Sequence, residues 1–161
     1  MNRLDQQAFS GLYETVYKDM YYFALYMMKN PQDAEDAVSE AVMAAYQNIH
    51  KLNCAEAFRS WIFKILSNTC KKKLIKRSRK EKHEVVRELR EEEASDWEFP
   101  LEAQDVRDAW ETLTEEERHI VALSVFGGYN SQEIGELFQT NANTVRSKRS
   151  RALGKMKGLL Q

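Results

Sequence analysis

Lysine and arginine side chains gather in two separate segments of this chain, and both segments have the chemistry of a surface that binds a polyanion. The segment 71–82 contains one acid, Glu81, and the segment after Gln139 contains none. Their cationic residues are Lys71, Lys72, Lys73, Lys76, Arg77, Arg79, Lys80 and Lys82 in the first, and Arg146, Lys148, Arg149, Arg151, Lys155 and Lys157 in the second. Since phosphate neutralisation supplies most non-specific affinity for nucleic acids, we expect two contacts with a nucleic acid. The formal net charge of −1 conceals this pattern because acidic segments elsewhere cancel it.

Other kinds of chemistry find little support in the residue pattern. The chain lacks a Gly-rich phosphate loop, a nucleophile elbow and a metal-ligand cluster, so we expect neither an enzyme nor a metal or other cofactor. Cys54 and Cys70 show no ligand spacing with each other or with the three histidines, which favours two reduced thiols. No stretch approaches the roughly 20 apolar residues of a membrane span. The sequence therefore predicts a cytoplasmic protein without membrane insertion.

The apolar pattern of the first half predicts three helices that would position these side chains. Apolar residues recur every three or four positions over 9–28, which predicts one helix. Asn30 and Pro31 then supply an N-cap and a first-turn proline for a second helix. After a break at 50–57, a third helix begins at Phe58 and continues into the first basic segment.

Two surfaces of these helices allow more than one interpretation. The acids Asp33, Asp36 and Glu40 point away from the apolar side of the second helix. They could form a solvated face or a surface that binds a partner. The aromatic residues within 58–64 lead into basic ones. They could pack in the core, or they could be stacking platforms for bases beside phosphate contacts.

The second half carries the capping signals of three further helices. Thr114 and Glu117 have capping-box spacing before an apolar run that ends at 127–128. Asn130 begins a second helix, and Asn141 can cap the final one.

These last two helices match a helix-turn-helix pattern. Gly135 is a small residue where the two helices would cross, and Val145 is an apolar residue inside the second. The final helix would lie in the major groove with its leading residues at base edges, whereas the alternative is a plain helical hairpin with a basic face. The candidate contacts to duplex DNA are Asn143, Thr144, Arg146, Ser147, Lys148, Ser150 and Arg151.

The charge becomes acidic over 84–108 around Pro100, which indicates a linker. We therefore expect an all-α protein with two small helical domains, one at 1–80 and one with the helix-turn-helix at 101–161. A charged linker at 81–100 would join them.

The order and spacing of four segments resemble the bacterial sigma factors of the sigma-70 family. Residues 113–157 resemble the promoter-reading C-terminal domain, and 144–148 its reader of the minus-thirty-five element. Residues 30–40 resemble the segment that docks on the clamp helices of core RNA polymerase, and 58–68 the segment that reads and melts the minus-ten element. With these two domains alone, the chain resembles the extracytoplasmic-function (ECF) type.

The resemblance implies an alternative sigma factor, which directs core RNA polymerase to promoter DNA, helps to open it, and has an anti-sigma factor as a further partner. It assigns polymerase docking to Asp33, Glu35, Asp36 and Glu40. It assigns the minus-ten element and its melting to Arg59, Trp61, Lys64, Asn68, Lys71 and Lys72. The loop 50–57 and Asn68 would help to hold a flipped base.

Three residues depart from the family pattern, and one rival function stays open. Gln139 stands where the turn usually has glycine, so a left-handed backbone there would cost on the order of 1 kcal/mol. Thr140 replaces an apolar residue. Arg149 lies on the apolar stripe of the final helix, so its stem must snorkel or the helix must rotate. The rival is a dimeric helix-turn-helix regulator, which would bind a palindromic site by itself.

Overall fold

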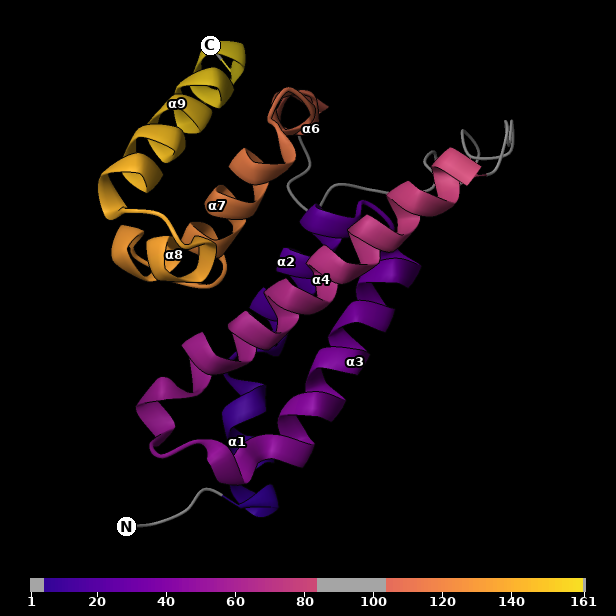
Figure 1. Cartoon of the computed structure of the whole chain (residues 1–161), viewed down its shortest axis with the longest axis vertical. Coiled ribbons are helices and arrows are strands. Elements are labelled where there is room, and N and C mark those ends of the chain that lie inside the picture. Colours follow the sequence, from indigo (N-terminus) through magenta and orange to yellow (C-terminus); the bar gives the residue numbers. More distant parts are fainter. Residues whose placement is uncertain (1–4, 84–103, 161) are drawn as a thin grey trace. The chain divides into compact units, whose positions relative to one another are not determined.

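The computed structural model describes residues 5–83 and 104–160, which fall into two compact units (Figure 1). Both units are helical and contain no strand within these ranges, so the all-α prediction is confirmed. The last described helix of the first unit continues to His83, three residues into the segment expected to be a linker. The rest of the predicted boundary lies outside the described residues. No helix in the described ranges is long and apolar enough to cross a membrane.

The first unit is built around three helices that pack against one another (Figure 1). Its elements are α1 (Gln6–Glu14), α2 (Tyr17–Met28), α3 (Pro31–Asn48), the 3-10 turns η1 (Ile49–Lys51) and η2 (Ala55–Ala57), and α4 (Phe58–His83). Ala37 and Ala41 are fully buried on α3, where small side chains allow the neighbouring helices to approach closely. Phe23 of α2 meets Phe63 of α4 edge to face, with ring centroids 5.7 Å apart. This core fixes the outward faces of α3 and α4.

The single helix predicted over 9–28 is wrong, because the chain breaks between α1 and α2. The Thr15 hydroxyl donates to the carbonyl oxygen of Leu12 at 2.6 Å, and the Val16 amide donates to Tyr13, three residues back. Val16 leaves helical geometry at φ −124° while its side chain stays buried. The side-chain bond of Thr15 offers the backbone an alternative to the helix, so the apolar period continues across a break.

The second unit packs three short helices against a long final one. These are α6 (Gln104–Glu111), α7 (Glu115–Val125), α8 (Ser131–Phe138) and α9 (Ala142–Leu160). Trp110, Leu123 and Ile134 are among the side chains that fill its core.

The predicted caps of both units are confirmed. Asn30 Oδ1 accepts from the Asp33 amide at 3.0 Å. Thr114 and Glu117 form a reciprocal capping box, and so do Asn130 and Glu133. The α9 helix begins after Asn141, whose side chain accepts from the Thr144 amide at 2.8 Å.

The turn between α8 and α9 leaves no room for a side chain at position 135. A Cβ at Gly135 would lie 2.7 Å from the carbonyl oxygen of Thr140 and 3.4 Å from the amide nitrogen of Ala142. The close neighbour is therefore the turn itself. Gln139 ends α8 in the left-handed region, at φ 57° and ψ 44°, as the family pattern led us to expect.

Gln139→Gly is expected to stabilise the second unit by about 1 kcal/mol, because glycine adopts positive φ without the Cβ clash. Chemical denaturation followed by hydrogen exchange of amides in 104–160 measures the change. Gln132→Gly is the control, because Gln132 is exposed inside the same helix. Gln132→Gly should lower the stability of the second unit by about 1 kcal/mol instead, because glycine is unfavourable inside a helix. Two changes of the same sign would contradict the strain at Gln139.

Candidate nucleic-acid interface

The outward face of α9 carries most of the side chains predicted to contact duplex DNA. Those that are exposed are Asn143, Arg146, Ser147, Ser150 and Arg151. Val145 and Ala152 are fully buried on the opposite side of the helix, against the rest of the unit. Thr144 is half-buried between the two faces.

Lys148 turns toward α7 instead of joining that exposed face. Its Nζ donates to Glu116 Oε1 at 2.7 Å. Lys155, about two helical turns further along the same face of α9, donates to Glu117 Oε1 at 2.8 Å, and this bond helps to lower the pKa of the Glu117 carboxyl. The second basic segment has no acid in sequence, but in the folded unit two of its cations pair with acids of α7. Both pairs hold α9 against α7.

Arg149 snorkels, which settles one of the alternatives left by the sequence. Its guanidinium Nη1 lies 3.4 Å from the hydroxyl of Ser124 on α7, and its side chain is half-buried. Because Val145 and Ala152 remain fully buried, the helix has not rotated to expose its apolar stripe. The stem of Arg149 therefore lies along the unit with its charge at the edge.

Asn143 and Arg146 form a pair on the exposed face of α9. Arg146 Nη1 donates to Asn143 Oδ1, one helical turn earlier. A guanidinium held in this way keeps further N–H groups available for an acceptor such as a guanine edge.

The predicted melting residues lie mainly on one outward face of α4. Lys64, Asn68, Lys71 and Lys72 are exposed, and Trp61 is half-buried beside Phe58 with ring centroids 6.1 Å apart. Phe58 and Phe63 are buried, so these two rings belong to the core.

The side chain of Arg59, also predicted to contact the minus-ten element, lies toward α2. Its Nη2 donates to Asp19 Oδ2 at 2.7 Å, and its guanidinium lies 5.4 Å from the ring centroid of Phe63. The guanidinium of Arg59 is therefore engaged by both the Asp19 carboxylate and the Phe63 ring. These contacts tie the start of α4 to α2.

The two thiols lie in contrasting surroundings. Cys54 is exposed in the loop that precedes α4, whereas Cys70 is buried inside that helix. Burial raises the pKa of the Cys70 thiol to about 12.

The four acids predicted to dock on polymerase divide into two pairs. Glu35 and Asp36 are exposed on α3. Asp33 instead pairs with Arg77 of α4, and Glu40 Oε1 lies 3.3 Å from Lys73 Nζ of the same helix.

Two features beside these acids were not predicted from the sequence. Met43 is 63% exposed and follows Asp36 and Glu40 by seven and three residues, which places it on their side of α3. A signal was present, since Met43 falls outside the apolar stripe of its helix.

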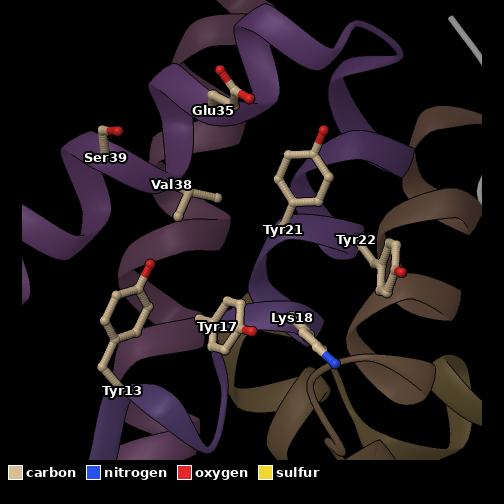
Figure 2. A pocket seen from close by; sticks show the side chains of 8 residues that line it. All are labelled: Tyr13, Tyr17, Lys18, Tyr21, Tyr22, Glu35, Val38 and Ser39. Carbon is tan, nitrogen blue, oxygen red and sulfur yellow. The ribbon is translucent and has the colours of Figure 1, made fainter. Parts of the chain in front are cut away.

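The second feature is a tyrosine-lined groove of about 480 Å³ beside α3 (Figure 2). Its lining residues are Tyr13, Tyr17, Lys18, Tyr21, Tyr22, Glu35, Val38 and Ser39. Figure 2 shows the tyrosine rings across from Glu35, Val38 and Ser39 of α3. Because Glu35 is also an exposed acid of α3, the groove adjoins the acidic face. Tyr13 and Tyr17 belong to the apolar pattern over 9–28, so the prediction of one long helix concealed the groove.

Comparison with known proteins adds an independent line of information. The family described as Sigma-70 region 2 matches residues 12–80, and Sigma-70, region 4 matches residues 103–156. RNA polymerase sigma factor SigV of Bacillus subtilis is 29% identical over 145 residues, which cover 87% of this chain and 83% of that protein. RNA polymerase sigma-H factor of Pseudomonas aeruginosa is 25% identical, with 94% of this chain and 86% of that protein covered.

The fold is similar to that of a solved sigma factor. RpoE of Bartonella quintana, crystallised with the anti-sigma factor NepR, superposes with a TM-score of 0.76 at 21% identity, over 94% of this chain and 96% of that one. The two family matches occur in the order of the two units and together span most of the chain. With relatives aligned over nearly its whole length, this chain belongs to the sigma-70 family and is of its extracytoplasmic-function type.

Proposed function

We propose that this alternative sigma factor divides promoter recognition between its two units. The chain directs RNA polymerase to promoters. In our proposal the unit of residues 5–83 docks on core polymerase and opens the minus-ten element. The unit of residues 104–160 reads the minus-thirty-five element as duplex. The division rests on a difference between two outward faces. That of α4 combines an aromatic ring with lysines, and that of α9 carries polar and basic side chains at the start of a helix after a tight turn.

The outward face of α9 suits duplex DNA. A helix that follows a tight turn and exposes Asn143, Arg146 and Ser147 near its start presents donors and acceptors to base edges in a major groove. Lys148 is left out of the proposed base contacts, because its ammonium is bound to Glu116. We assign it the role of keeping α9 in position.

The outward face of α4 suits separated strands. Trp61 offers part of an aromatic ring, Asn68 can bond a base edge, and the lysines at 64, 71 and 72 can contact phosphates. Melting is cheapest where pairing is weak, and a base that leaves the stack needs such partners. Arg59 is left out for the ion pair described above.

The outward face of α3 suits a protein partner better than DNA, because it is acidic. We assign polymerase docking to Glu35, Asp36 and Met43, with Met43 as an apolar contact inside a polar rim. The tyrosine-lined groove continues this face. Asp33 and Glu40 lie at its other edge, beside α4.

We also expect an anti-sigma factor to bind this chain. RpoE was solved with NepR, and CnrH, another similar structure, with the cytosolic domain of CnrY. We place the action of this chain in the cytoplasm, as an initiation factor without catalytic activity of its own.

The test compares the free chain with its complex with core polymerase. The free chain should bind promoter duplex weakly, and specific binding should require core polymerase, because each unit offers only a small DNA surface. Gel-shift titration and in-vitro transcription on upstream regions of the source genome measure both. Nanomolar, sequence-specific binding of a palindromic site by the free chain would favour the dimeric regulator instead.

An acidic docking face calls for a basic surface on the partner, and an arginine at position 36 would repel that surface. Asp36→Arg is therefore expected to weaken association with core polymerase about tenfold or more. Fluorescence anisotropy of labelled chain titrated with core polymerase measures the affinity. Glu14→Arg is the matched control, since Glu14 is also exposed in the first unit and undergoes the same charge change. Unchanged affinity in Asp36→Arg, with helical circular dichroism retained, would show that docking occurs elsewhere.

A further inference from the structure

Two acids of α3 and two cations of α4 form a line of ion pairs between the helices. Asp33 Oδ2 accepts from Arg77 Nη2, and Glu40 Oε1 lies 3.3 Å from Lys73 Nζ. We call these four side chains the α3–α4 ion pairs. The acids come from the segment proposed to dock on polymerase, and the cations from the basic segment proposed to contact DNA.

The ion pairs divide the basic segment of α4 into two sets. Lys71, Lys72, Lys76, Arg79 and Lys80 are exposed. Lys73 and Arg77 lie one helical turn apart on the side that faces α3, with side chains 25% and 31% exposed. Arg77 is anchored twice, since its Nη1 also donates to the carbonyl oxygen of Met28 at 2.9 Å. Two of the cations that the sequence offers to phosphates are therefore occupied in the free chain.

The same ion pairs are accessible from outside. The Asp33 and Glu40 side chains are 43% and 62% exposed, so a basic partner can reach both carboxylates. Half-exposed ion pairs contribute little stability, because water screens them and the long side chains lose entropy. An external cation that approaches either acid can therefore replace its partner on α4.

We propose that Lys73 and Arg77 are a latent phosphate-binding pair, which Glu40 and Asp33 occupy in the free chain and a cationic surface of core polymerase releases. The proposal rests on the function proposed above, because it takes polymerase as the partner of α3. After release, Lys73 would lie beside the exposed cations of α4. The guanidinium of Arg77 would keep the hydrogen bond from Nη1 to Met28, and its Nη2 would be available to a phosphate. Docking and DNA binding then strengthen each other, since coupling between two ligands is reciprocal.

The experiment neutralises the two acids in the free chain and compares a charge-matched variant. Asp33→Asn/Glu40→Gln removes the partners of both cations. Glu35→Gln/Asp36→Asn makes the same change in net charge on α3 without touching the ion pairs. Binding of each chain to a labelled non-specific duplex is measured over a range of KCl, with circular dichroism as the check on folding. Each additional phosphate contact makes the slope of log K against log salt steeper by about 0.9.

The expected result is a slope steeper by about 1.8 for Asp33→Asn/Glu40→Gln, which corresponds to two released cations, and a wild-type slope for the charge-matched variant. Adding Lys73→Gln/Arg77→Gln to the first variant should return the slope to the wild-type value. Equal slopes in the two acid variants would overturn the latent pair while the DNA-binding function stands. If none of the chains binds duplex at low salt, the latent pair and the proposed DNA-binding function of the chain both fail.

Discussion

Gly135→Ala is expected to destabilise the second unit by about 1–3 kcal/mol and to remove its binding to the minus-thirty-five element. The added methyl would lie 2.7 Å from the carbonyl oxygen of Thr140. That neighbour is backbone, so no side-chain rotation relieves the contact, and the turn before α9 must move. Such a shift misplaces Asn143 and Arg146 together, because both lie in the first turns of α9.

Gly154→Ala is the matched control, because it adds the same methyl to the same unit in open space. Apart from the adjoining residues and the backbone of its own helix, no heavy atom of the described structure lies within 4 Å of a Cβ at Gly154. Alanine inside a helix should therefore stabilise the unit by about 0.5–1 kcal/mol. Hydrogen exchange of amides in 104–160 along a urea series measures both variants. Equal stability of the two would contradict the close approach at Gly135.

Arg146→Ala and Asn68→Ala are expected to impair two different steps of initiation by the holoenzyme. Arg146→Ala should weaken binding of the minus-thirty-five element by about 1–3 kcal/mol if a bidentate base contact is lost, while a pre-melted template still opens. Asn68→Ala should leave the closed complex nearly intact and reduce strand opening. Both side chains are exposed, so neither change should unfold the chain.

One promoter suffices to separate the two effects. Footprinting of the upstream element reports duplex binding, and permanganate reactivity of unpaired thymines reports opening. Trp61→Ala is a poorer probe, because its ring contacts Phe58 and its loss would also cost stability. If both variants lose upstream protection and opening together, the assignment of duplex reading to one unit and melting to the other fails.

The features that the sequence predicted well are local ones. A cap such as Asn30 or Asn141 acts on a backbone amide three residues away, so neighbouring residues determine it. The capping boxes at Thr114 and Asn130 follow the same rule. The left-handed backbone at Gln139 was expected from the family resemblance instead, since a glutamine does not by itself indicate positive φ. The exposed residues of α9 were also predictable, since the buried position of Val145 sets the direction of the helix.

The features that the sequence missed depend on which helices become neighbours. Lys148 belongs to a segment without acids, yet Glu116 lies 32 residues earlier and reaches its ammonium. Arg59 and Asp19 are 40 residues apart. The break at Thr15 was missed for the opposite reason, because the apolar period continues through it unchanged.

The contrast between the two thiols offers a simple route to site-selective labelling. A thiolate reacts with maleimides, and the high pKa and burial of Cys70 leave that side chain unreactive at neutral pH. Cys54 alone is exposed, four residues before Phe58 and the start of α4. The unmodified sequence can therefore receive a single dye in the loop next to the proposed strand-opening face, so that the kinetics of opening can be followed optically without engineered cysteines.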